Sequence, residues 1–321
     1  MHKYLRSIGF SDYNSEKDIE KLLQDMVSYS VDRKALKIDE HTTFCEIRGE
    51  TAPGMGIAIY GTIDGDGRFR REYYYPYMES MDITSQAECQ IQRHTEKETF
   101  SGLLEEYRVG ISLIFFMDNL FEYRKMQAEK GKEKIRDVRL SALCNEGKVL
   151  LPIKKTSRQI EMARVAAKDR NSLIEAAKNG DEDAIETLTI EDIDMYSQIS
   201  KRVQKEDLYS IIDTCFMPWG VECDQYSIIG DIKKVDEKRN RFTGEDVYDL
   251  TLECSDLTFH VGIAKKDLLG EPLPGRRFKG QIWMQGIVDF DDSSYGFVSA
   301  ARPPASAIGA PSPTVRQDFK P

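Results

Sequence analysis

Histidine and closely paired cysteines are scarce in this 321-residue sequence, and their scarcity excludes several kinds of metal site. The chain has only 4 histidines, so a multi-histidine centre would need nearly all of them to converge. None of the 6 cysteines forms a C-x-x-C pair, which leaves a zinc knuckle or a thioredoxin-type motif unsupported. We expect reduced, buried thiols at Cys45, Cys89, Cys144, Cys215, Cys223 and Cys254. The sequence predicts no metal and no cofactor.

Recognisable catalytic signatures are also missing. The chain has no G-x-S-x-G, G-x-x-x-x-G-K-[ST] or H-E-x-x-H motif, and no G-x-G-x-x-G after a strand. His41 and Cys45 lie four residues apart, but in a strand-like segment that spacing spans about 13 Å. Asp64–Gly67 resembles the start of a calcium loop, yet its twelfth position is Tyr75 and its flanks are strand-like. We interpret that segment as a hairpin turn.

Long hydrophobic runs are absent. The longest, Ile111–Met117, is far shorter than the roughly 20 residues of a membrane-spanning helix. Met1–Phe10 lacks the apolar region and the cleavage site of a secretory signal. We therefore expect a cytoplasmic protein with no membrane association.

Basic residues are fewer than acidic residues in this sequence. The chain has 45 Lys+Arg against 55 Asp+Glu, a formal charge of -10, a pI near 5.2 and a mean hydropathy of -0.50. This balance disfavours a general affinity for nucleic acid, because phosphate backbones select basic surfaces. Hydrophobic residues make up 40% of the chain, enough for about two packed domains.

Residues 1–152 are expected to form one α+β domain around an antiparallel sheet. Apolar residues recur at helical spacing within residues 15–29, and Ser15 is a suitable N-cap. Residues 106–117 have the pattern of one central strand. Residues 138–151 are expected to form a pair of strands joined at Asn145–Gly147.

Residues 153–217 have no strand pattern and are expected to form a helical connector. Thr156 and Ser172 each begin a capping-box pattern, Asn179 and Gly180 stop a helix, and Asp181 caps the next. A further cap at Thr189 predicts a string of short helices.

Alternation returns in residues 218–301 and predicts a small antiparallel β-barrel, similar to an OB-fold. Ser255 and Asp256 are expected to form a two-residue hairpin turn between two of its strands. The Pro-, Ala- and Ser-rich residues 302–321 are expected to be a disordered tail.

One candidate site in this last domain centres on His260. The expected hairpin places His260 opposite Thr251, with Asp249 and Glu253 diagonal on the same outward face. These carboxylates could hold a charged imidazole and support proton transfer or ligand binding. A solvated strand face explains the same residues more simply.

A second candidate surface lies on the strand around residues 276–285. Arg277, Lys279 and Trp283 alternate onto one face, and an aromatic ring flanked by cations suits the stacking of a base or sugar. Packing of Trp283 in the interior is the simpler alternative. Residues 222–292 also hold 15 acidic against 10 basic residues, a poor balance for binding phosphate.

The strongest charge asymmetry lies earlier. Residues 124–170 hold 14 Lys/Arg against 6 Asp/Glu, and residues 171–221 hold 4 against 11. Adjacent blocks of opposite sign favour a contact between domains, self-association, or a protein partner. Nucleic acid is a weaker alternative, because the basic block lacks the signature of an RNA reader.

Four segments carry a resemblance to a known family: Met1–Phe10, Ala176–Ile190, Phe216–Tyr226 and Arg276–Gly286. In these segments the chain resembles an uncharacterised bacterial family of domains of unknown function, over nearly its whole length except the tail. The resemblance implies a bacterial cytosolic protein, and it assigns no activity and no site residue.

The favoured hypothesis is a non-catalytic binding, scaffold or regulatory protein. One alternative is a hydrolase or transferase that uses carboxylates and His260 in a cleft between domains. The second alternative is nucleic-acid binding through the C-terminal domain.

Overall fold

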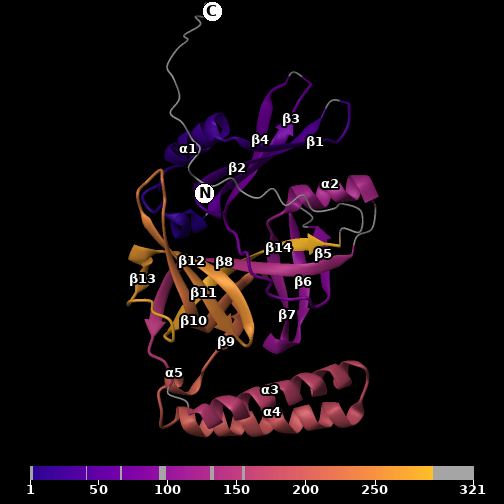
Figure 1. Cartoon of the computed structure of the whole chain (residues 1–321), viewed down its shortest axis with the longest axis vertical. Coiled ribbons are helices and arrows are strands. Elements are labelled where there is room, and N and C mark those ends of the chain that lie inside the picture. The colour runs from indigo at the N-terminus through magenta and orange to yellow at the C-terminus, as the bar shows by residue number, and fades with distance from the viewer. Residues whose placement is uncertain are drawn as a thin grey trace, which may run out of the picture. The chain divides into compact units, whose positions relative to one another are not determined.

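Two β-sheets and a set of peripheral helices make up the fold, which confirms the α+β class (Figure 1). The structure is a computed structural model, and it describes residues 3–40, 42–65, 67–93, 99–130, 134–153 and 156–291. The predicted tail at 302–321 therefore lies outside the described residues.

The smaller sheet is an antiparallel meander covered by one helix. Its strands pair in sequence order: β1 (Asp32–Lys37), β2 (Thr43–Ala52), β3 (Met55–Ile63) and β4 (Phe69–Met78). Helix α1 (Glu16–Tyr29) buries its apolar stripe, including Leu22 and Met26. The Ser15 hydroxyl accepts a hydrogen bond from the Asp18 amide, which confirms the predicted cap.

The larger sheet has ten strands and mixes parallel with antiparallel pairs. Its order is β13-β8-β12-β11-β10-β14-β7-β6-β5, with β9 paired to β10. The strands are β5 (Cys89–Arg93), β6 (Phe100–Glu106), β7 (Ile111–Met117), β8 (Ile135–Leu150), β9 (Cys215–Pro218), β10 (Gln225–Arg239), β11 (Asp246–Cys254), β12 (Leu257–Ala264), β13 (Leu268–Leu269) and β14 (Arg277–Phe290).

Strand β8 connects the two halves of the sequence. It pairs in parallel with β12, where Ser141 faces His260, and antiparallel with β14, where Leu140 faces Gly286. Both strands on either side of β8 come from the predicted C-terminal domain. A closed barrel built from residues 218–301 is therefore not supported, because β12 and β14 both pair with β8. The predicted boundaries at 152 and 218 separate stretches of chain that share one sheet, and Met1–Phe290 form one compact unit.

The structure also corrects two local predictions. Residues 106–117 are not one strand, because the 3-10 turn η2 (Tyr107–Val109) and Gly110, with a φ of 71°, separate β6 from β7. Asn145–Gly147 is not a turn but continues β8. A Cβ on Gly147 would lie 2.6 Å from the Phe278 ring, so this glycine serves close packing rather than chain reversal.

The other predicted turn, at Ser255 and Asp256, is confirmed. Both residues have positive φ values, 51° and 62°, and join β11 to β12 in the expected register. This geometry matches the tight two-residue hairpin turn whose twist suits antiparallel strands.

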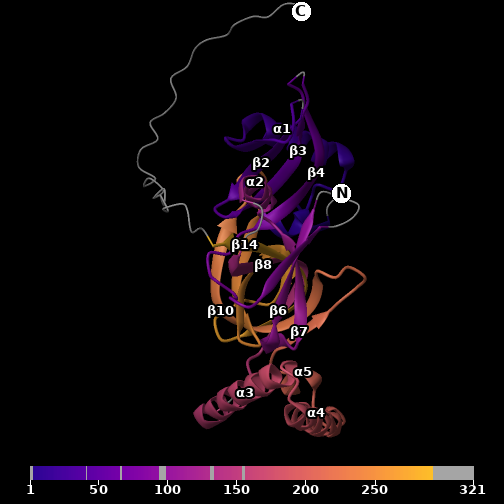
Figure 2. The ribbon, with the colours of Figure 1, turned by 90° about the vertical axis from the view of Figure 1, so that its right-hand side faces the viewer.

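The segment between β8 and β9 folds into two long helices instead of a string of short ones. Helices α3 (Ser157–Lys178) and α4 (Glu182–Val203) lie side by side as a hairpin, followed by the short α5 (Leu208–Ile211) (Figures 1 and 2). The caps at Thr156 and Asp181 and the stop at Asn179 and Gly180 are confirmed. The remaining helical elements are η1 (Lys3–Ile8), α2 (Leu120–Lys130) and η3 (Lys265–Asp267).

Two predicted caps are wrong. Ser172 and Thr189 lie inside α3 and α4, and their hydroxyls donate to the carbonyls of Lys168 and Ile185, four residues earlier. A hydroxyl bonded in this way is compatible with a helix interior. The local sequence pattern therefore predicts more helix N-termini than the structure contains.

A buried arginine joins the two sheets. Arg48 of β2 donates to the Asp118 carbonyl, at 2.8 Å, just beyond the end of β7, and to Glu46 at 2.8 Å. The Tyr60 hydroxyl donates to Glu46 at 2.6 Å, and the Tyr75 hydroxyl donates to the Asp118 carbonyl. Because Arg48, Glu46 and Asp118 are almost fully buried, loss of any partner would leave a charge without compensation.

The role of β8 predicts how a fragment behaves. Residues 215–291 contain β9–β14 but lack the strand that lies between β12 and β14. We expect this fragment to show no cooperative thermal unfolding by circular dichroism, because two strand edges and their apolar side chains become exposed. Residues 1–291 serve as the control and are expected to unfold cooperatively. A sharp unfolding transition of the short fragment would show that β8 is dispensable.

Candidate functional site

His260 lies in a network of charged groups on β10, β11, β12 and the chain after β4. Its Nδ1 is 2.8 Å from Oδ1 of Asp249, and its Nε2 is 3.2 Å from Oδ2 of Asp82. The second carboxylate oxygen of Asp249 pairs with Lys238 at 2.9 Å. The structure thus brings together His260 and Asp249 of the predicted site and adds Asp82 and Lys238.

The network shifts the protonation of its buried members. Burial opposes the charged imidazole, but hydrogen bonds and charges from Asp249 and Asp82 outweigh it and raise the pKa of His260. Burial likewise opposes the Asp249 carboxylate, but His260 and Lys238 outweigh it and lower the pKa of Asp249. This geometry stabilises an imidazolium between two carboxylates.

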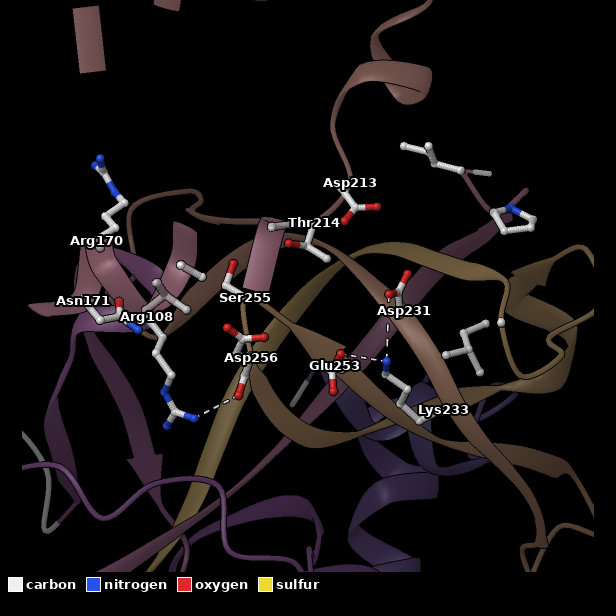
Figure 3. A pocket seen from close by; sticks show the side chains of 18 of the residues that line it. Arg108, Arg170, Asn171, Asp213, Thr214, Asp231, Lys233, Glu253, Ser255 and Asp256 are labelled. Atoms are coloured by element: carbon white, nitrogen blue, oxygen red, sulfur yellow. Dashed lines mark hydrogen bonds and ion pairs between the residues drawn. The ribbon is translucent and has the colours of Figure 1, made fainter. Parts of the chain in front are cut away.

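Glu253 does not join His260. Its carboxylate instead pairs with Lys233 at 2.7 Å and lines a separate cleft of about 970 Å³ (Figure 3). Helix α3 forms one wall of this cleft, and the middle of β10, the end of β11 and the η2 segment form the other. His260 and Asp249 are not among the lining residues, so the structure does not combine the predicted acid–base group with the cleft.

The cleft is lined by charges that already have partners within the chain. Lys233 lies near both Glu253 and Asp231, and Arg108 donates to the Asp256 carbonyl at 2.9 Å (Figure 3). Arg108 also pairs with Glu106 at 2.6 Å. The described residues that line the cleft thus carry both positive and negative charges, and these charges pair with one another or with nearby groups of the same chain.

Arg277 of the second predicted surface is buried and structural. Its guanidinium donates to the carbonyls of Leu151 at 3.0 Å, Ile212 at 2.7 Å and Tyr209 at 2.7 Å. Leu151 precedes the α3–α4 hairpin, whereas Tyr209 and Ile212 follow it. One side chain therefore holds together the two chain segments through which the hairpin leaves and rejoins the sheet.

Lys279 and Trp283 are also engaged internally. Lys279 contacts the hydroxyl and the ring of Tyr209, with its Nζ 4.5 Å from the ring centroid. Trp283 is 5% exposed, stacks on Tyr4 with ring centroids 5.4 Å apart, and donates to Asp224 at 2.8 Å. The expected exposed face for base or sugar stacking is thus corrected: its aromatic ring belongs to the core.

The α3–α4 hairpin exposes apolar side chains that the sequence analysis did not single out. Eight of them are between 45% and 75% exposed, and we call them the hairpin surface: Met162, Val165, Ile185, Ile190, Ile193, Met195, Tyr196 and Val203. Among the described residues of the two helices, only Ala184 is buried. Single exposed apolar residues are ordinary, whereas a large contiguous apolar patch is typical of interaction sites.

The spacing of three of these residues places them on one face of α4. Ile185, Tyr196 and Val203 are 11 and 7 residues apart, about three and two turns of helix. On α3, Ala163 and Ala167 line the cleft, whereas Met162 and Val165 do not. The sequence did contain this signal, because apolar residues occur on more sides of α4 than one neighbour can cover.

Opposite charges of the two helices meet within the hairpin. Arg170 of α3 pairs with Asp192 at 2.6 Å and Glu191 at 3.4 Å on α4. The opposite charges of the basic and acidic blocks are therefore compensated, in part, within one helical hairpin. Lys178 at the end of α3 pairs with Glu105 of β6 at 2.8 Å.

No cluster of three or more ligating side chains suited to a metal ion occurs among the described residues. Cys45 lies buried in β2, and His41 lies outside the described residues. Asp64 accepts the Arg68 amide in the connection between β3 and β4, as a hairpin turn requires, while Asp66 is not described. No helix in the described parts of the chain has the length and apolar character to span a membrane.

The comparisons with known proteins identify a family without an assigned activity. Residues 5–286 match the family model DUF3881, described as "Domain of unknown function, E. rectale Gene description". The chain belongs to this family, which confirms the resemblance to an uncharacterised family. Neither the curated proteins nor the solved structures gave a match.

Replacing His260 tests the charged network. We expect His260→Gln to destabilise the protein by about 1–3 kcal/mol at low pH, the usual cost of a buried polar group that loses its partner. Since the folded state raises the pKa of His260, its stabilisation is complete below the unfolded value of about 6.5 and is lost as pH rises through the folded value. Urea unfolding of both proteins from pH 5 to 9 measures this difference. A constant difference across that range would contradict the assignment.

Replacing Arg277 tests the attachment of the hairpin. Arg277→Lys keeps the charge but places all its donors on one nitrogen, which cannot reach three carbonyls as widely spaced as those bound by the guanidinium, so we expect a loss of roughly 1.5–3 kcal/mol. Hydrogen exchange of residues 204–214 is expected to accelerate, while β11 is unaffected. Arg276→Lys is the control, because Arg276 donates to the Glu271 carbonyl instead. Equal effects of the two substitutions would argue against a specific role for Arg277.

Proposed function

We propose that this chain is a non-catalytic scaffold or regulatory protein of the bacterial cytoplasm that docks a protein partner through the hairpin surface. The proposal rests on one observation, the eight exposed apolar side chains of the hairpin surface on α3 and α4. The partner has a stated chemistry: a pair of helices with an apolar seam, flanked by acidic groups opposite α3 and basic groups opposite α4.

The energetics of exposure support this assignment. Burying a side chain such as Ile193 or Tyr196 stabilises a complex by about 1.5–3 kcal/mol before the costs of association are subtracted. The hairpin is also firmly anchored. Arg277 holds its base, and the Lys178–Glu105 pair holds the far end of α3. A docking element fixed in this way loses little conformational entropy when a partner binds.

The two alternative functions receive less support from the geometry. A carboxylate and histidine enzyme needs its acid–base group beside a substrate cleft, but His260 and Glu253 point to different sites. Base stacking on the C-terminal strands, as the nucleic-acid hypothesis envisaged, needs an exposed Trp283, and this residue is 5% exposed.

Site-specific photo-crosslinking tests the docking proposal. A photoreactive p-benzoyl-phenylalanine is placed at Tyr196, which is 75% exposed, and at Tyr29 of α1, which is 83% exposed. On irradiation in native cells, we expect covalent adducts of defined mass from position 196 and few from position 29. Mass spectrometry of the adducts must identify a protein with paired helices at the crosslinked peptide. Equal or absent crosslinking at the two positions would refute the proposal.

A further inference from the structure

We infer that the occupant of the hairpin surface is a second copy of this chain, whose own α3–α4 hairpin packs across a two-fold axis to form a four-helix bundle. This inference rests on the proposed function, because it names the partner of the same surface. It follows from the distribution of charge, the apolar spacing and the size of the hairpin.

The two helices of the hairpin carry net charges of opposite sign. In sequence, α3 holds five basic against three acidic residues, and α4 holds six acidic against two basic residues. A two-fold interface places the same patch of both subunits face to face, so the patch must be its own complement. A hairpin with one basic and one acidic helix meets this condition when α3 of one copy packs on α4 of the other.

The charges also select one arrangement of the bundle. Contact of α4 with α4 of the second copy would bring six acidic residues against six, which like-charge repulsion disfavours. Contact of α3 in one copy with α4 in the other would instead form ion pairs between the copies. Arg170 and Asp192 already form such a pair at 2.6 Å within one chain. Each helix then has a neighbour of opposite charge on both sides.

The size of the hairpin suits a stable interface. Interfaces of standard size take about 20–30 residues from each partner. Helices α3 and α4 have 22 residues each, so one face of the hairpin, together with its flanks, supplies this number. The apolar residues at 185, 196 and 203 would form the seam, and the charged residues would form its rim, as in other helical bundles.

Sedimentation equilibrium of the purified full chain tests the inference. We expect a dimer at micromolar concentration. Ile185→Asp, in the seam, is expected to raise its dissociation constant by about 100-fold or more, because the two-fold axis introduces the buried charge twice. Ile38→Asp, at a residue 52% exposed on the chain between β1 and β2, is the matched control and should leave the dimer intact. A monomer at every concentration, or equal effects of both substitutions, would overturn the inference.

A charge exchange tests the pairing of the helices directly. One variant carries Arg158→Glu and Lys168→Glu on α3, and the other carries Glu182→Lys and Glu186→Lys on α4. We expect each variant alone to be monomeric and their mixture to form a heterodimer, since mixing restores opposite charges at both contacts. Circular dichroism checks that each variant is folded. Folded variants that stay dimeric alone, or that fail to associate when mixed, would contradict the α3-to-α4 arrangement.

These outcomes are distinguishable from failure of the proposed function. If the pure chain is monomeric but photo-crosslinking at Tyr196 captures a different helical protein, the docking surface stands and the second copy is excluded. If Tyr196 gives no specific adduct and the chain is monomeric, both proposals fail.

Discussion

Strand β8 is the constraint on which the rest of this structure depends. It leaves the first half of the chain and enters between β12 and β14 of the second half, in parallel with one and antiparallel with the other. A parallel pair requires a long crossover connection, and the crossover here contains the whole helical segment. The sheet therefore fixes the ends of β8 and β9, and the α3–α4 hairpin connects these two strands.

The position of the hairpin follows from that constraint. The chain leaves β8 at Leu150 and returns at Cys215, and Arg277 on the adjacent strand binds carbonyls on both sides of the insertion. Arg170, Lys178 and their carboxylate partners then hold the two helices to one another and to β6. Electrostatic pairs thus orient a hairpin that buries little apolar surface within the chain. Burial of its exposed apolar side chains against a partner would therefore contribute most of the binding free energy.

Local features of this fold could be predicted from sequence, because they depend on neighbouring residues. The caps at Ser15, Thr156 and Asp181 and the turn at Ser255 and Asp256 were of this kind. The insertion of β8 between β12 and β14 could not be predicted, since it joins segments more than 100 residues apart and no local pattern encodes strand order. For the candidate sites, alternation placed His260 near Asp249, but it did not distinguish a buried Arg277 or Trp283 from exposed ones. That distinction depends on what packs against the strand, here the chain near Leu151 and the ring of Tyr4.

The central claim is that the exposed face of the α3–α4 hairpin is covered when the protein assembles. Backbone hydrogen exchange of the full chain, measured at submicromolar and at high micromolar concentration, tests it most directly. We predict that amides of Glu182–Val203 exchange more slowly at the higher concentration, while those of β8 keep the same rate. Exchange in α4 that is independent of concentration would contradict self-association as the reason for its exposed residues.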